Sequence, residues 1–448
     1  MIDLKAKNFF SKNSTKSNKQ NSDNVDDLFW ASSNKTRKIT KKNKLSDSFL
    51  NKNASGWEIG HLLNDMFLAA FKYKASDIHI EPAEYQLNIR FRVDGVFMNY
   101  KTFELEQKDQ IVARLKIMSF LKIDESRLPQ DWKINYKLFW WKTIDMRVSV
   151  LPIIYWEKIV IRILKKEDKP TDLKDLWILP YNMVKIKKHL KAPSGMILAV
   201  WPTGSWKSTT LFSLLSQFNP LEKNISTLED PVEYRILGVN HSQIHPDIWF
   251  NFASWLRSIL RQDPDIIMVW EIRDEETAKL ASEASITWHI VFSTLHTNSA
   301  VNTIQRLMNL WIDPLLISSA IRLIISQRLV RKLCDYCKIE YTPTEKVRQK
   351  IIWRVWRYLK DKTFRLHKHK GWGCEKCNNM WYVGRIGIYE VLEITPWLET
   401  LLLKWASKTQ LEIFSIWEWL IPIKDDALMK VVLWETSLEE MFSVLGTG

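Results

Sequence analysis

A lysine and a serine with phosphate-binding potential, Lys207 and Ser208, lie in the stretch WPTGSWKSTT, between the apolar segment MILAV (196–200) and the helix-like segment TTLFSLLSQF. With glycine at 201 and 206, this stretch would match the pattern G-x-x-x-x-G-K-[ST]. In that pattern backbone N–H groups surround the phosphates, the lysine contacts the β- and γ-phosphate oxygens and the serine hydroxyl binds Mg²⁺. The predicted loop comprises Trp201, Pro202, Thr203, Gly204, Ser205, Trp206, Lys207, Ser208 and Thr209.

Tryptophan occupies both glycine positions of this loop, and the composition suggests why. The 448 residues include 23 Trp and 12 Gly, whereas an average soluble protein of this length contains roughly 30 Gly. Trp also stands where turns favour glycine, at Trp140 and Trp141 between two strand-like segments and at Trp132 after Asp131. We therefore predict that many Trp represent glycine encoded by UGA. The alternative is a genuinely Trp-rich protein with an inactive loop.

Carboxylates follow two further strand-like segments. Glu271 comes after DIIMV (265–269), separated from it by Trp270, and Glu229, Asp230 and Glu233 lie in TLEDPVEY. A carboxylate just past a buried strand can orient water or Mg²⁺ at a phosphate loop. A solvated strand end is the alternative for any one of them, but two such clusters favour a nucleotide site.

All four cysteines fall in two C-x-x-C pairs. CDYC contributes Cys334 and Cys337, and CEKC contributes Cys374 and Cys377. Four thiolates from two tight turns can bind Zn²⁺ tetrahedrally, and such a site leaves no open position for catalysis. We expect a structural zinc site, with a redox or disulfide pair as the alternative.

Charge and hydropathy divide the chain into regions. The formal charge is +14, and residues 1–50 hold eleven Lys or Arg against five Asp. Residues 1–55 are polar, so we expect a disordered basic tail. Neither a signal peptide nor an apolar run of about 20 residues is evident, which predicts a cytoplasmic location.

The pattern beyond the tail predicts two folded domains. Helical spacing over 60–75 and alternating segments over 87–93 and 134–164 indicate a small α+β domain at 56–164. A linker is expected at 165–180. Buried-type strands alternate with helices over 181–448, which predicts an α/β fold with a doubly wound sheet. The strand-like segments are 196–200, 224–229, 265–269 and 289–294.

Several segments together resemble a known family. SDIHIEP, RLPQD, TLEDPVEY, LRSILRQDPDIIMV, STLHTN, SQRLVRKLC and GRIGIYEVL are similar to segments of the secretion ATPases that assemble type IV pili and type II secretion pseudopili. The similarity covers about residues 56–445. It implies a RecA-like phosphate-loop ATPase domain, a preceding PAS-like α+β domain and a zinc-knuckle insertion at about 330–382. That family has glycine where this chain has Trp132, Trp156, Trp201, Trp206, Trp255, Trp270, Trp288, Trp311 and Trp381.

The resemblance also implies roles for individual residues. Lys207 and Ser208 would bind ATP and Mg²⁺, Glu271 would be the catalytic carboxylate, and Glu229 and Asp230 would belong to an acidic box. His289 and His296 match the family's histidine box, although a single histidine near a strand is more often structural. The arginines that match positions approaching phosphate, some from a neighbouring domain, are Arg147, Arg162, Arg257 and Arg261.

The implied assembly is a homohexamer at the inner face of the cytoplasmic membrane. It would act on an inner-membrane platform protein, and through it on pilin or pseudopilin, without direct nucleic-acid contact. Relatives usually carry a larger N-terminal domain, in whose place the basic tail could be a weak tether to anionic lipid. The alternatives are a retraction or conjugation-type ATPase, disfavoured by the four cysteines, an inert scaffold if Trp201 and Trp206 are genuine, and a DNA-binding role supported only by charge.

Overall fold

The computed structural model describes residues 56–139, 142–164, 171–200, 207–233, 235–244, 252–358, 364–371 and 373–446. Several predicted features lie outside these residues: the tail at 1–55, the turn at Trp140 and Trp141, much of the charged segment at 165–172, and loop positions 201–206. Within the described part of the chain, no helix is long and apolar enough to cross a membrane.

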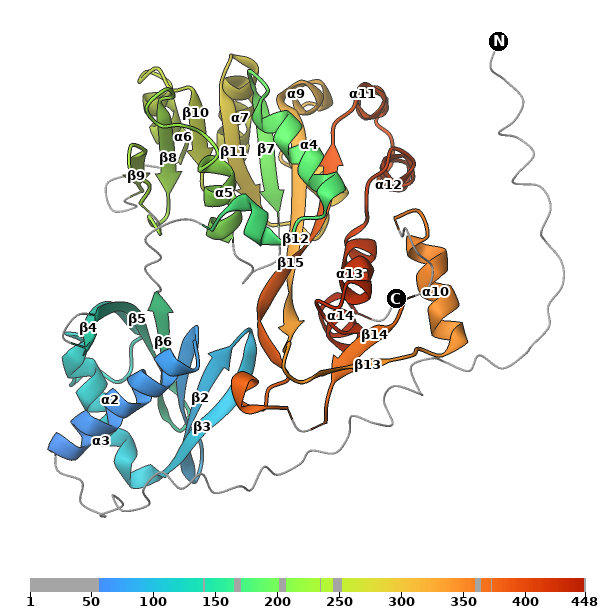
Figure 1. Ribbon diagram of the computed structural model, residues 1–448. Coiled ribbons are helices and arrows are strands. Elements are labelled where there is room, and N and C mark those ends of the chain that lie inside the picture. Colours follow the sequence, from blue (N-terminus) through green and yellow to red (C-terminus); the bar gives the residue numbers. More distant parts are fainter. Residues whose placement is uncertain are drawn as a thin grey trace, which may run out of the picture. The chain divides into compact units, whose positions relative to one another are not determined.

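The first sheet is antiparallel, with the strand order β3-β2-β1-β6-β5-β4 (Figure 1). Helices and a short 3-10 turn accompany it: α2 (Gly56–Lys72), α3 (Lys108–Met118) and η1 (Leu105–Gln107). The strands are β1 (Asp77–Pro82), β2 (Gln86–Val93), β3 (Val96–Glu104), β4 (Gln130–Phe139), β5 (Lys142–Ile153) and β6 (Trp156–Leu164).

Alternation of side chains gives this first sheet one apolar and one charged face. Leu87, Ile89 and Phe91 on β2 are buried in a cluster with residues of α2 and α3, because successive residues of a strand point to opposite faces. On the other face the Arg90 guanidinium lies 2.5 Å from Glu81. The expected α+β unit and its strand alternation are therefore observed.

The second sheet is mixed, with the order β15-β12-β7-β11-β10-β8-β9. All neighbours are parallel except β12 and β15, which are antiparallel. The strands are β7 (Gly195–Val200), β8 (Ile225–Glu229), β9 (Asn240–Gln243), β10 (Ile266–Val269), β11 (Ile290–Leu295), β12 (Ile321–Leu333) and β15 (Tyr382–Glu393). A separate two-stranded sheet joins β13 (Lys338–Tyr341) to β14 (Leu366–His369).

Helices connect and follow the strands of the second sheet. Six of these described helices begin with a side-chain cap, such as Asp274, which accepts a hydrogen bond from the Thr277 N–H at the start of α7. The helices are α4 (Pro180–Leu190), α5 (Lys207–Leu215), α6 (Phe252–Ile259), α7 (Glu275–Ile286), α8 (Ala300–Asn309), α9 (Pro314–Ala320), α10 (Glu345–Val355), α11 (Pro396–Leu403), α12 (Lys408–Trp417), α13 (Ile423–Val432) and α14 (Leu438–Leu445), with 3-10 turns η2 (Leu173–Leu176) and η4 (Glu375–Cys377).

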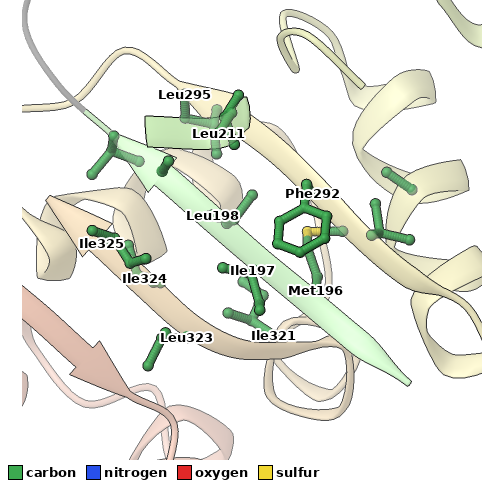
Figure 2. Close-up of a cluster of buried hydrophobic side chains, with 14 of the residues drawn as sticks. Met196, Ile197, Leu198, Leu211, Phe292, Leu295, Ile321, Leu323, Ile324 and Ile325 are labelled. Atoms are coloured by element: carbon green, nitrogen blue, oxygen red, sulfur yellow. The ribbon is translucent and has the colours of Figure 1, made fainter. Parts of the chain in front are cut away.

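Strand β7 lies in the middle of the apolar core. All six of its residues are buried, and Ile197 and Leu198 lie among Phe292 of β11 and Ile324 of β12 (Figure 2). Burying a large aliphatic or aromatic side chain contributes roughly 1.5–3 kcal/mol. This packing holds the end of β7, after which the predicted phosphate loop begins.

A buried ion pair within α13 is hydrogen-bonded to β15. Asp426 and Lys430 are 0% and 2% exposed, and their side chains lie 2.6 Å apart. The Asp426 carboxylate also accepts a hydrogen bond from the Tyr389 N–H at 3.0 Å. Burial raises the pKa of Asp426 and lowers that of Lys430, in each case against the attraction of the partner. Each charge therefore offsets the cost of burying the other.

We predict that Asp426→Ala lowers the free energy of unfolding by about 3–5 kcal/mol, because it leaves the Lys430 ammonium buried without its partner. Urea unfolding at neutral pH measures the effect. The matched control is Lys408→Ala, which removes an exposed pair with Glu412 at 3.5 Å and should change the stability by less than about 1 kcal/mol. Equal effects of both substitutions would contradict the prediction.

Candidate functional site

Four parallel strands of the second sheet end at one edge. The register pairs Val200 of β7 with Leu295 of β11, and Val269 of β10 with both Ser293 and Leu228. In sheets of this kind ligands bind outside the carboxyl ends of the strands. The segments that follow the four strands hold the predicted loop, His296, Glu271 and Asp230.

Glu271 is the centre of a charged cluster at this edge. It is 8% exposed, and one of its oxygens lies 3.2 Å from His296 Nε2. The other oxygen lies 3.1 Å from the guanidinium of Arg273, which also comes within 3.9 Å of Asp230. The structure therefore brings the predicted residues Glu271, His296 and Asp230 together, with Arg273 between the two acidic groups.

Glu229, the last residue of β8, is fully buried and held by two neighbours. Thr227 Oγ1 donates to Glu229 Oε1 at 2.7 Å, and His241 Nδ1 lies 2.8 Å from the same oxygen. His241 Nε2 accepts a hydrogen bond from the Ile236 N–H at 3.0 Å, so Nδ1 carries the proton and donates to Glu229. Glu229 Oε2 has no hydrogen-bond partner among the described residues.

The first turn of α5 brings a hydroxyl to a carboxylate. Ser208, buried as the second residue of this helix, donates a hydrogen bond from Oγ to Glu233. Hydroxyl and carboxylate oxygens are the ligand types that Mg²⁺ takes in nucleotide sites. Thr210 on the same helix donates to Gln327 Oε1 of β12 at 2.6 Å, which fixes α5 to the sheet. These positions fit the predicted role of Ser208.

The structure corrects the expectation for His289. Its carbonyl accepts from the Gly195 N–H at the start of β7, and its ring nitrogen Nδ1 lies 2.9 Å from the Ala284 carbonyl. It therefore precedes β11, whereas His296 follows it. Six strand residues span about 20 Å, so the two histidines lie at opposite edges of the sheet. Only His296 is near the acidic cluster, because strand polarity separates them.

Two of the predicted arginines lie on or just after helix α6, which belongs to the second sheet's part of the chain. Arg257 on α6 forms an ion pair with Glu276 of α7, and Arg261 donates to Ser258 Oγ at 3.3 Å. Within the part of the chain that the structure describes, neither has a hydrogen bond or ion pair with Glu271. Their guanidinium groups are thus engaged by neighbouring helix residues.

The other two arginines belong to the first sheet. Arg147 of β5 and Arg162 of β6 are directly opposite each other in the antiparallel register. Arg162 Nε donates to Asp77 Oδ1 of β1 at 2.9 Å, and Arg147 Nε is buried without a described hydrogen-bond partner. The two basic groups therefore share one face of this sheet.

Two residues of the site are absent from the sequence-based predictions. Arg273 lies two positions after Glu271 in EIRDEETA, a proximity that could have signalled it. His241 gives no local signal, because it reaches Glu229 only through the parallel pairing that places Thr227 opposite His241.

The four cysteines converge as predicted. Their sulfur atoms all lie within 4.8 Å of one another, with Cys334–Cys374 at 3.6 Å and Cys337–Cys377 at 3.8 Å. A tetrahedron of sulfur ligands at about 2.3 Å from zinc has edges of about 3.8 Å, so the cluster has the dimensions of a zinc site.

The thiols of this cluster differ in acidity. Burial raises the pKa of Cys334 and Cys337. Burial acts on Cys377 in the same direction, but the N–H donors of Cys374 and Trp381, together with the Cys374 and Cys337 thiols, outweigh it and lower its pKa to about 7. A thiolate is therefore accessible near neutral pH at one of the four positions.

The parallel strands of the second sheet, the acidic groups at their carboxyl ends and the loop sequence before α5 define a RecA-like ATPase of the phosphate-loop class. The family described as "Type II/IV secretion system protein" matches residues 53–443, and the chain belongs to this family. It is accordingly an ATP hydrolase, and the predicted fold class and family are confirmed.

Characterised relatives carry specific names. The chain is 40% identical over 403 residues to the type IV pilus assembly ATPase PilB of Myxococcus xanthus, covering 90% of this chain and 70% of the relative. It is 42% identical over 383 residues to the type II secretion system ATPase E of Vibrio cholerae, covering 86% and 74%.

Solved structures support the fold alone. The ATPase DotB of Legionella pneumophila has a TM-score of 0.61 at 21% identity, covering 85% of this chain and 94% of that one. The pilus retraction motor PilT with bound ADP has a TM-score of 0.54 at 22% identity, covering 85% and 96%.

We predict that His241→Ala lowers the kcat of ATP hydrolysis about tenfold, in protein carrying glycine at 201 and 206. The substitution removes one of the two donors that orient Glu229, whereas KM for ATP should change little. His241→Gln keeps a side-chain N–H donor and should restore most of the rate. Steady-state phosphate release measures both parameters, and equal rates for the alanine, glutamine and parent proteins would contradict the prediction.

Proposed function

We propose that this chain is the ATPase motor that assembles type IV pili or type II secretion pseudopili. The single observation that carries the proposal is the cluster of Glu271, His296, Arg273 and Asp230 at the sheet edge where β7 leads into the phosphate-loop sequence. The names of the pilus assembly and type II secretion relatives support the biological role. Hydrolysis would drive movement of an inner-membrane platform protein, and through it addition of pilin or pseudopilin subunits.

The nucleotide site comprises the loop from Trp201 to Thr209. Lys207 would contact the β- and γ-phosphates, and Ser208 with Glu233 would hold Mg²⁺. When bound, Mg²⁺ neutralises charge that develops on the phosphate oxygens. The contact between the Ser208 hydroxyl and the Glu233 carboxylate supports this assignment, since it gathers two oxygen ligands at the first turn of α5.

Glu271 would orient the water that attacks the γ-phosphate in line and accept its proton. Arg273 and His296 contact different oxygens of this carboxylate, so they would fix its direction. Glu229 would act indirectly and not on the attacking water itself. Its Oε1 is already hydrogen-bonded by Thr227 and His241, while Oε2 lacks a described partner.

The loop requires glycine at 201 and 206, and we propose that both tryptophans are glycine in the cell. Backbone N–H groups must approach the phosphates closely there, which a side chain on either residue would obstruct. The Trp excess and Gly deficit of the whole chain support reading UGA as glycine. If both tryptophans were genuine, the chain would be an inert scaffold.

The cysteine cluster would bind one structural Zn²⁺ through Cys334, Cys337, Cys374 and Cys377. Three sulfur separations of 3.6–3.8 Å and a spread of all four sulfurs within 4.8 Å support it, and the four-thiolate donor set leaves no ligand position for chemistry. The family's assembly ATPases commonly carry such an insertion, so the cluster favours assembly over retraction.

We expect purified protein to contain about one zinc ion per chain, and removal by a strong chelator to lower the thermal unfolding midpoint, because structural zinc stabilises the folded state. Elemental analysis and thermal unfolding measure the two effects. Cys374→Ser should lose the metal, whereas Ser437→Ala, outside the cluster, should retain it. Metal-free native protein, or zinc retained by Cys374→Ser, would contradict the zinc assignment.

The proposed assembly is a homohexamer bound peripherally to the inner face of the cytoplasmic membrane. The domains would be 56–164 and 181–448, joined by the linker at 165–180. Arg257 and Arg162 each form an ion pair within the chain. When the domains close, these arginines would leave their carboxylate partners and bind phosphate. The basic tail at 1–55 would contribute attraction to anionic lipid.

Restoring glycine at 201 and 206 should give Lys207-dependent ATP hydrolysis. We expect Lys207→Ala to lower kcat by roughly 100-fold, because a cation at the developing phosphate charge is lost. The exposed Lys408→Ala serves as the control and should keep the parent rate. Phosphate release measures all three proteins. Absence of Lys207-dependent hydrolysis in the glycine-containing, folded protein would remove the motor function and leave the scaffold.

A further inference from the structure

Tryptophan is concentrated at left-handed backbone positions. Among the described residues, fourteen that are not glycine have positive φ, and eight of these are Trp. Positive φ is uncommon outside glycine, and the exceptions are usually Asn or Asp. Asn and Asp account for only four of the fourteen here. Trp has no local hydrogen-bonding group that would favour this conformation, so the concentration requires a separate explanation.

Four of these tryptophans end helices with one shared hydrogen-bond pattern. The Trp N–H donates to the carbonyl three residues earlier, and the next N–H donates to the carbonyl five residues before it. This is the Schellman motif, in which the position occupied here by Trp is usually glycine. The residues are Trp311 after α8, Trp405 after α11, Trp419 after α12 and Trp434 after α13, with φ of 61°, 54°, 65° and 68°.

Two further tryptophans end elements in the same conformation. Trp177 is the C-cap of η2 with φ 62°, and Trp288 follows α7 with φ 70°. Their φ values lie in the left-handed region, where a side chain is disfavoured by contact between Cβ and the carbonyl oxygen. A Trp that ends a helix in this conformation therefore carries a conformational cost, which glycine would avoid.

Three of these six indole side chains contribute little packing. Trp288, Trp311 and Trp405 are 79%, 83% and 70% exposed, although Trp is usually well buried. Trp434 is the best connected of the six, since its Nε1 donates to the Arg365 carbonyl at 3.1 Å. All six residues thus share the left-handed backbone conformation, whereas the side chains of Trp288, Trp311 and Trp405 have little contact that would require an indole.

The same cap also occurs with ordinary residues. Lys74 after α2 and Phe120 after α3 have positive φ and the same pair of hydrogen bonds. One Trp at a cap would therefore prove nothing. Asn378 after η4 also has this pair, so four of the seven such non-glycine caps among the described residues are Trp. In a sequence with a glycine deficit, that share indicates a common cause.

We propose that Trp177, Trp288, Trp311, Trp405, Trp419 and Trp434 are glycine in the native protein, inserted at UGA codons. Backbone conformation thereby identifies recoded positions far from the phosphate loop, four of which, Trp177, Trp405, Trp419 and Trp434, the sequence resemblance did not mark. The assignment is independent of the proposed motor function, because it rests on φ and helix-end hydrogen bonds alone.

Peptide mass spectrometry of the protein isolated from its own cells tests the assignment directly. We expect glycine at all six positions, with Phe120 and Lys74 as internal controls that remain Phe and Lys. Trp, or any residue other than glycine, at these positions would overturn the proposal. A failed ATPase assay would leave this outcome untouched, so the two proposals fail separately.

A recombinant comparison tests the backbone argument without native material. One variant of the full chain replaces Trp311, Trp405, Trp419 and Trp434 with Gly, and a second replaces the same four with Ala. Because only alanine carries a Cβ, we expect the glycine variant to be more stable, by about fivefold in the folded-to-unfolded ratio per position. Urea unfolding measures it, and an alanine variant of equal or greater stability would contradict the argument.

Discussion

The parallel pairing of β7 with β11 and β12 is the constraint on which the rest of the second sheet depends. All six residues of β7 are buried, and side chains from both neighbouring strands fill the space around them (Figure 2). Parallel pairing aligns the carboxyl ends of the strands, so whatever residue follows each strand is delivered to one edge. The chemistry of the site is therefore a consequence of apolar burial elsewhere in the same strands.

Charge balance then determines how the acidic groups at that edge are held. Glu271 is nearly buried, yet its two oxygens contact His296 and Arg273 separately. Glu229 is fully buried, and among the residues that the structure describes Thr227 and His241 hydrogen-bond one of its oxygens while the other has no partner. A buried carboxylate is costly unless it is paired or hydrogen-bonded. These contacts both offset that cost and give each carboxylate a defined direction.

Glycine is the third physical requirement, and it acts at the backbone. At the phosphate loop it permits close approach of N–H groups, and at helix ends it permits left-handed φ without a Cβ clash. In this sequence tryptophan occupies both kinds of position. Trp201 and Trp206 lie in the phosphate loop, and Trp311 and Trp405 are among those at helix ends. The proposed change in codon meaning would account for both.

The sequence alone determined the features that depend on local pattern or motif. The alternation of Leu87, Ile89 and Phe91 predicted one buried sheet face, the apolar segment 196–200 predicted the buried strand β7, and two C-x-x-C pairs predicted the convergence of Cys334 with Cys374. Tertiary structure decided the rest, because contacts between distant segments follow strand order and polarity. It placed His289 at the far edge from His296, brought His241 to Glu229, and made Arg273 the link between Glu271 and Asp230.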